Sequence, residues 1–239
     1  MKYILIADIL GFSNLISNNE HADKILDKWV SSITKIKNDV EITLLSDTIF
    51  AVSDSLSKVI KYANAILEIG AKDAIPIRGA ITHGEVANNK LIYGKAVIMA
   101  HKLEMNQNWM GIMIDNEAIP EQYCKQHVNS GLVLKYLVPV KEGKDIISYV
   151  VNWNVRDVDA LHMVFNKHNS NLKNNVKILN LFYNTLDFFI YKKFINKLNK
   201  IPTEYIYYKE NLNRISAYFD CVLTKLDNDL LCEIIKEGQ

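Results

Sequence analysis

The stretch that decides the fold is KYILIADILGFS, residues Lys2–Ser13. Its first half is a short run of β-branched, aromatic and other apolar residues that ends at Asp8, which predicts a buried strand over Lys2–Ala7. Gly11 then marks a turn before the start of a helix, and it permits close approach to the backbone. The amides from Leu10 onward are therefore expected to lie at a helix N-terminus, where backbone N–H groups can cradle a phosphate.

The spacing of apolar residues outward from this stretch predicts further helices and strands. Ser46-Asp47 is a tight polar connection between two strands, so this pair is expected to form a hairpin with Asp47 at its tip. The order β-α-β-β-α-β predicts an α+β fold, with helices on one face of a mostly antiparallel sheet. The expected helices are 13–37, 56–71, 94–107 and 120–127, and the expected strands after the first are 40–44, 48–52, 76–86, 110–114, 131–138 and 146–151.

The amino-acid composition changes beyond about Trp153. Segments 155–168, 172–198 and 204–236 are rich in Leu, Ile, Phe, Tyr, Asn and Lys and are predicted to be helices. We therefore expect a core domain over 1–153 and a helical C-terminal extension over 154–239. The extension is expected to be either a helical subdomain packed on the core or a dimerisation and lid element.

Composition and charge exclude several classes of protein. The 239 residues are 49% hydrophobic and include only 9 Gly and 4 Pro, which excludes collagen-like, low-complexity and disordered chains. A net charge of +1 gives no reason to expect a nucleic-acid partner. The 3 cysteines are too few and too scattered for a disulfide framework or a zinc site. No clean apolar run of about 18 residues occurs, so we expect no membrane segment and a soluble, cytoplasmic protein.

Two acidic residues carry the candidate chemistry. Asp8 and Asp47, if they lie on adjacent antiparallel strands, can hold two divalent cations about 4 Å apart. Mg²⁺ or Mn²⁺ suits such an all-oxygen set of ligands. Arg78 could supply a guanidinium to the charge that develops in a phosphoryl-transfer transition state. Taken one at a time, these residues also fit ordinary roles, because Asp is common in caps and turns and Arg78 could be a surface residue of a strand.

Four segments together resemble the class III nucleotidyl cyclase catalytic domain, in the same order and over roughly Lys2–Val151. These segments are 8–13, 44–52, 78–86 and 93–104. The resemblance implies an antiparallel sheet of the ferredoxin-like, or palm, type with helices. The compact size and the segment Arg78–Ile81 make the chain most like the bacterial pyrimidine (uridylate or cytidylate) cyclases of Pycsar antiphage systems.

The resemblance implies a role for each matched residue. Two Mn²⁺ or Mg²⁺ ions per site would be held by Asp8, Asp47 and the main-chain carbonyl of Ile9. Arg78 would join the two aspartates as a catalytic residue. The triphosphate would be bound by Gly11, Phe12, Ser13, Arg78 and Lys102, and the base-recognition positions would be Thr43 and Leu91. The family's active sites form between two subunits, so the resemblance also implies a homodimer with sites at its interface.

The departures from the family pattern bear on the substrate. Purine cyclases of this family read the adenine edge with a Lys and an Asp, at the positions of Thr43 and Leu91. Their transition-state Asn and Arg stand at the positions of Ile98 and Lys102. Loss of the purine readers, with both metal carboxylates kept, favours conversion of UTP, or less readily CTP, to the cyclic nucleotide and pyrophosphate. The product would be the signal of an antiphage defence system and would act through a downstream cyclic-nucleotide-binding effector.

Two other functions stay open from the sequence. The chain could be an adenylate or guanylate cyclase with unusual base readers. It could also be a catalytically silent cyclase-fold module that binds nucleotide or a partner for regulation. Ile98 and Lys102 favour the silent module, and the two aspartates, Asp8 and Asp47, oppose it.

Overall fold

The computed structural model describes the chain except for residues 19–20, 37–38, 89–90, 156–157, 167–175 and 199–239. The chain divides into two compact units, Met1–Phe182 and Tyr183–Gln239. The boundary between 1–153 and 154–239 stays a prediction. The helix predicted over 204–236 lies outside the described residues.

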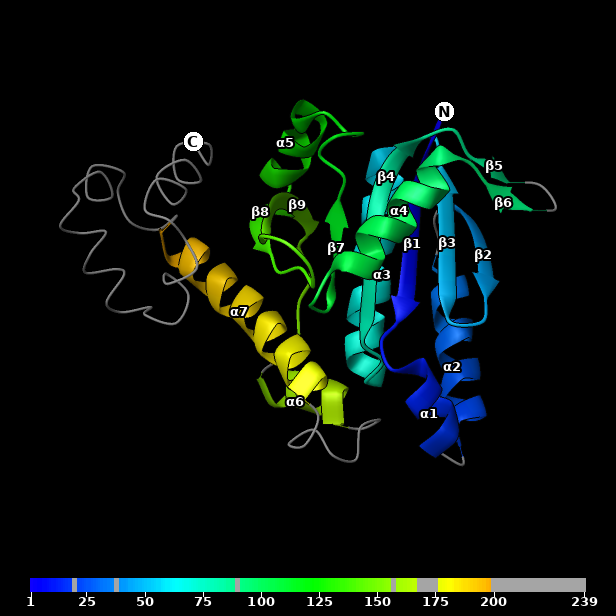
Figure 1. Ribbon diagram of the computed structural model, residues 1–239, viewed down its shortest axis with the longest axis vertical. Coiled ribbons are helices and arrows are strands. Elements are labelled where there is room, and N and C mark those ends of the chain that lie inside the picture. The colour runs from blue at the N-terminus through cyan, green and yellow to red at the C-terminus, as the bar shows by residue number, and fades with distance from the viewer. Residues whose placement is uncertain (19–20, 37–38, 89–90, 156–157, 167–175, 199–239) are drawn as a thin grey trace. The chain divides into compact units, whose positions relative to one another are not determined.

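A seven-stranded sheet forms the centre of the described part of the first unit. Its strand order is β2-β3-β1-β4-β7-β9-β8, and every neighbouring pair is antiparallel except β4 with β7 (Figure 1). The strands are β1 (Lys2–Ile9), β2 (Glu41–Leu45), β3 (Thr48–Ser53), β4 (Ile77–Gly84), β7 (Gly111–Ile114), β8 (Val133–Val138) and β9 (Ile146–Val151). The predicted mixed α+β fold with a mostly antiparallel sheet is therefore confirmed.

A separate two-stranded ribbon joins β5 (Ala87–Asn88) to β6 (Ile92–Tyr93) and was not predicted. Two residues per strand are too few to show an alternating pattern. The ribbon leads to Gly94, which has φ +141° and directly precedes α4. A Cβ at Gly94 would lie 2.1 Å from the carbonyl oxygen of Glu85, so the close approach of these two segments requires glycine.

Helices precede and follow the strands much as the apolar spacing predicts. They are α1 (Phe12–Asn18), α2 (Ala22–Thr34), α3 (Leu56–Asp73), α4 (Lys95–Asn106), α5 (Glu121–Asn129), α6 (Val158–Asn166) and α7 (Val176–Leu198). The single helix predicted over 13–37 is wrong, because the structure has two helices there. Asn18 ends the first, and asparagine favours helix ends because its side chain competes for backbone hydrogen bonds. None of the helices in the described ranges is long and apolar enough to cross a membrane.

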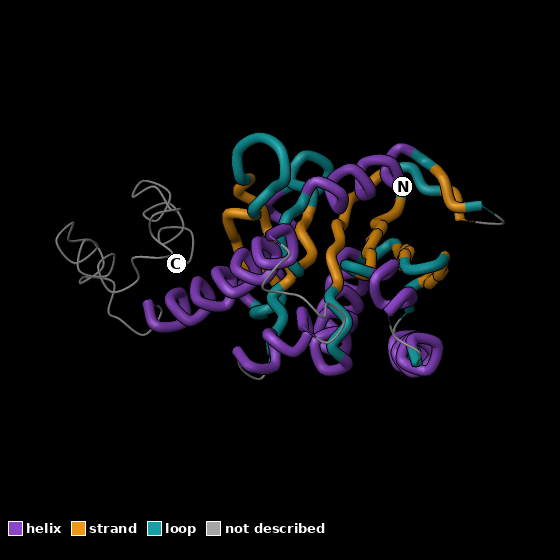
Figure 2. Tube along the Cα trace, turned by 60° about the horizontal axis from the view of Figure 1, so that its bottom comes forward, coloured by secondary structure: helices purple, strands orange, loops and turns teal. Residues whose placement is uncertain are grey.

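Helices cover both faces of the sheet, so the prediction of helices on one face is wrong (Figure 2). On one face, Ile4 and Ile6 of β1 pack in a cluster with Ala96 and Ala100 of α4. Helix α3 contacts β1, β3 and β4 from the other face. All four residues 4–7 of β1 are at most 1% exposed, because successive side chains point to opposite faces and both faces are covered. The unbroken apolar run of β1 is typical of such two-sided burial.

Candidate active site

The candidate site lies where β1 and the β2–β3 hairpin end, at the same end of the sheet (Figure 1). Asp8 is the last residue but one of β1, and its Cα partners are Thr48 on β3 and Arg78 on β4. The Thr48 hydroxyl Oγ1 donates a hydrogen bond of 3.4 Å to Asp8 Oδ1. Asp8 is partly buried. The sheet register therefore brings Asp8 and Arg78, two of the predicted residues, side by side.

The hairpin brings Asp47 to the same place. Ser46 and Asp47 connect β2 to β3, and Ser46 adopts a left-handed φ of +56°. Burial raises the pKa of Asp8, and the charge of Asp47 raises it further, to about 7. Hydrogen bonding between the two carboxyl groups adds to this effect. The two carboxylates that the sequence singles out thus lie together.

The charge balance around Asp8 favours a cation. The carboxylate of Glu104 also raises the pKa of Asp8, whereas the Arg78 guanidinium lowers it. Like charges held this close are stabilised by a bound cation. No set of three or more His, Cys, Asp or Glu side chains in the described ranges is arranged to hold a metal. A Mg²⁺-type site built from two carboxylates and substrate phosphates needs no third side chain, so Asp8 and Asp47 fit such an ion.

The turn after β1 leads from the end of the strand that carries Asp8 into helix α1. Gly11 has φ +77°, and its carbonyl accepts the first α1 hydrogen bond from the Leu15 amide at 3.0 Å. Helix α1 begins at Phe12, so the amides of residues 11–13 lie at its N-terminus. The Leu10 amide donates instead to the Pro76 carbonyl at 2.9 Å, so its expected place in the phosphate cradle is wrong. The predicted role of Gly11, Phe12 and Ser13 stays a prediction.

Arg78 is buried and bound within the chain. Its Nε and Nη2 lie 2.7 and 2.5 Å from Glu104 Oε1, and its Nη1 donates to the Gln107 carbonyl at 3.1 Å. Only 7% of the Arg78 side chain is exposed. No role was predicted for Glu104, although it continues the buried face of α4 that Ala96 and Ala100 begin. A carboxylate on a buried helical face needs a cationic partner, and that signal was available in the sequence.

Two further predicted residues, Ile9 and Thr43, lie on β1 and β2. Ile9 is buried beside its Cα partner Ile77, and the role of its carbonyl stays a prediction. Thr43 is exposed on the edge strand β2 and is the Cα partner of Phe50, which in turn pairs with Ile6. Cross-strand partners share a face, so Thr43 lies on the face of the sheet that carries Asp8 and α4.

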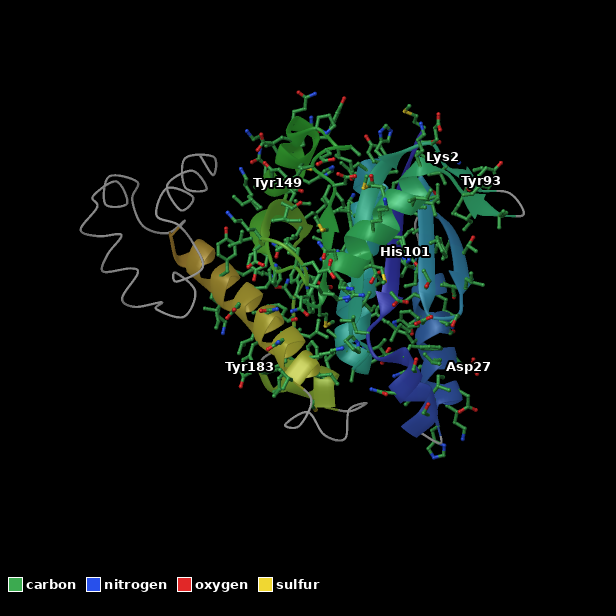
Figure 3. All side chains as sticks on the ribbon, in the orientation of Figure 1. Lys2, Asp27, Tyr93, His101, Tyr149 and Tyr183 are labelled. Atoms are coloured by element: carbon green, nitrogen blue, oxygen red, sulfur yellow. The ribbon has the colours of Figure 1, made fainter. Side chains whose placement is uncertain are left out.

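Lys102 and Ile98 are both exposed on α4, and Leu91 is exposed just before β6. His101, from the same helix as Lys102, is labelled in Figure 3, and its Nδ1 lies 3.7 Å from Glu104 Oε2. Thr43, Lys102 and Leu91 thus present their side chains to solvent from β2, from α4 and from the segment just before β6. The roles predicted for them stay predictions.

Several solved structures of nucleotide cyclases resemble this chain. A bacterial light-regulated adenylyl cyclase matches with 17% identity and a TM-score of 0.48, over 68% of this chain and 55% of its own. The guanylyl cyclase Cya2 matches with 13% identity and a TM-score of 0.42, over 65% of this chain and 93% of its own. An adenylate/guanylate cyclase/hydrolase from Silicibacter pomeroyi matches with 19% identity and a TM-score of 0.43, over 63% and 95%.

This chain therefore spans about half the length of the light-regulated cyclase. No protein-family model matches the sequence, and no curated protein sequence matches it. At these identities and TM-scores the similarities assign no activity to the chain.

Proposed function

We propose that this chain is a nucleotidyl cyclase that converts UTP, and less readily CTP, to the 3′,5′-cyclic nucleotide and pyrophosphate. The observation that carries the proposal is the meeting of Asp8 and Asp47, whose mutual repulsion helps to raise the pKa of Asp8 to about 7. A carboxylate pair of this kind suits Mn²⁺ or Mg²⁺, with two ions per site. The cyclase-like order of the four sequence segments adds support.

The reaction needs no other cofactor. The ribose 3′-oxygen forms a bond to the α-phosphorus, the bond from that phosphorus to the bridging oxygen of the β-phosphate breaks, and pyrophosphate leaves with the electron pair. The hydroxyl proton passes to water. Bound divalent ions would acidify the hydroxyl and neutralise the phosphate charge. Asp8 and Asp47 would hold the divalent ions, and the amides of residues 11–13 would bind and orient the phosphates of the substrate.

The substrate base is assigned from two positions. Thr43 and Leu91 replace the Lys and Asp that read adenine in purine cyclases, so the long donor and the carboxylate are missing. The Thr43 hydroxyl can donate or accept a hydrogen bond, which fits either O4 of uracil or the amino group of cytosine. The preference for UTP rests on the resemblance to the Pycsar group, in which uridylate cyclases are the commoner kind. The same resemblance supports a role as signal generator of antiphage defence, upstream of a cyclic-nucleotide-binding effector.

We also assign the chain to a homodimer with two sites at its interface. Several large apolar side chains are exposed on β2, on α4 and beside β6, namely Leu45, Leu91, Tyr93, Ile98, Met99 and Met105. A second copy related by a twofold axis would cover such a surface with the same surface of its own. Each copy would then offer Thr43 and Lys102 to the carboxylate pair of the other.

The turnover of ATP, GTP, CTP and UTP, each incubated separately with the purified chain and Mn²⁺, tests the substrate assignment. We expect kcat/KM to be about tenfold or more higher for the pyrimidines than for the purines, because a purine edge would be left without its polar partners. Faster turnover of ATP or GTP than of both pyrimidines would refute the pyrimidine assignment. Faster turnover of CTP than of UTP would overturn only the preference for UTP.

A further inference from the structure

A buried polar cluster joins α4 to β4 beside the carboxylate pair. Its members are Arg78, Glu104, Gln107 and Trp109, each at most 6% exposed, and we call it the α4–β4 clasp. Arg78 stands on β4 as the Cα partner of Asp8, whereas Glu104 stands on α4. The clasp therefore connects the helix above the sheet to the strand next to the candidate active site.

Hydrogen bonds tie two successive residues of β4 to the end of α4. Arg78 binds the Glu104 carboxylate and the Gln107 carbonyl. Gln107 Nε2 donates to the carbonyl of Gly79 at 2.8 Å and to that of Leu103 at 3.1 Å. Trp109 Nε1 donates to Gln107 Oε1 at 2.9 Å, which fixes the amide in this orientation. The position of α4 over the sheet thus depends on these bonds as well as on its apolar packing.

The geometry leaves Arg78 little capacity to bind a substrate. Three N–H groups of its guanidinium already have partners within the chain, and 7% of its side chain is exposed. A residue that binds phosphate has to present free N–H donors to the phosphate oxygens. The charges of both Arg78 and Glu104 nevertheless act on Asp8, which places the clasp next to the proposed site.

We propose that Arg78 and Glu104 are positioning residues of the proposed cyclase. Their ion pair holds α4, which carries the exposed Lys102, at a fixed place relative to Asp8 on β1. This inference rests on the proposed function and replaces the phosphate-binding role predicted for Arg78. A buried ion pair of this kind is costly to break on one side only, because one charge is then left buried without its partner. An apolar pair of similar size has no such cost.

The test compares Arg78→Met, Glu104→Leu and the variant that carries both substitutions. We expect each single substitution to lower kcat for UTP about tenfold or more and to leave KM within about threefold. The double variant should regain kcat to within about threefold of the unchanged chain, since it buries no unpaired charge. A KM raised about tenfold or more in both Arg78→Met and the double variant would overturn the proposal and make Arg78 a phosphate ligand.

Two further measurements keep the test decisive. If a single variant does not fold, Arg78→Lys takes its place in the test. This substitution retains the charge but loses the planar guanidinium, and it should lower kcat without raising KM. A raised KM in this variant would also contradict the proposal. Lys28→Met is the matched control, because it breaks a 2.7 Å ion pair with Asp73 that joins α2 to α3 and should leave kcat unchanged.

Hydrogen exchange of the α4 amides measures how firmly the clasp holds α4, and this measurement does not depend on turnover. We expect exchange over Lys95–Asn106 to be about tenfold faster in each single variant and to return toward its original rate in the double variant. Unchanged exchange in the single variants would refute the positioning role. If the chain turns over no nucleotide, this measurement still decides the inference, so the failure of the proposed function is told apart from the failure of the clasp.

Discussion

We expect the substitution Asp47→Asn to lower the proposed Mn²⁺-dependent turnover of UTP by on the order of a thousandfold. The amide keeps the shape of the side chain at the tip of the β2–β3 hairpin but removes the charge that a divalent cation needs. The same substitution relieves the repulsion that raises the pKa of Asp8, so Asp8 alone would have to hold the ion. The measurement is kcat/KM for UTP over a titration of Mn²⁺.

Asp27→Asn provides the control for this substitution. Asp27 is exposed on α2 and is labelled in Figure 3, and the change in charge and shape is the same. Turnover by this variant should stay within about twofold of the unchanged chain, since a surface charge on another element has little effect on the site. If Asp47→Asn also kept its activity within a few-fold, the assignment of the carboxylate pair would be wrong.

Mixing two inactive variants restores turnover if the active sites are shared between subunits. Asp47→Asn removes the cation site, and Lys102→Ala removes an exposed cation of α4 that we assign to the partner's site. Equal mixing yields heterodimers in about half of the dimers, and one of the two sites in each is intact. We therefore expect about a quarter of the activity of the unchanged chain after the subunits have exchanged.

A mixture of Asp8→Asn with Asp47→Asn is the matched negative control. Both residues belong to one carboxylate pair on one chain, so a heterodimer of these variants has no intact site and should stay inactive. Rescue by Lys102→Ala but not by Asp8→Asn would place the two sides of the site on different subunits. Absence of rescue in both mixtures would contradict the shared site and leave the fold assignment unaffected.

The sequence predicts the carboxylate pair because strand patterns are local. Asp8 follows an apolar run, and Asp47 lies in a two-residue connection between two strands. The strand ends that carry these two residues can therefore be located without knowledge of the rest of the chain. Once the two strands are neighbours, antiparallel pairing fixes the register and brings the residues together. The sequence also predicts a strand around Arg78, but the pairing of that strand with the one that carries Asp8 is seen only in the structure.

The sequence does not predict which partner a buried charge takes. From the sequence, Arg78 could face solvent, a substrate or another side chain. The packing of α4 on β4 makes Glu104 its partner. The placement of helices on both faces of the sheet was missed for a related reason, since apolar spacing marks a buried side of α4 but not the sheet face that it covers. The break after Asn18 was missed because the apolar stripe continues in phase across it.

Identification of the products formed from UTP tests the central claim most directly. The purified chain is incubated with UTP and Mn²⁺, and the nucleotide product and the released phosphates are separated by chromatography and quantified. The account predicts 3′,5′-cyclic UMP and pyrophosphate in equal amounts, with formation of both abolished by a chelator of divalent cations. Release of UDP with inorganic phosphate, or no cyclic product from any of the four nucleoside triphosphates, would contradict it.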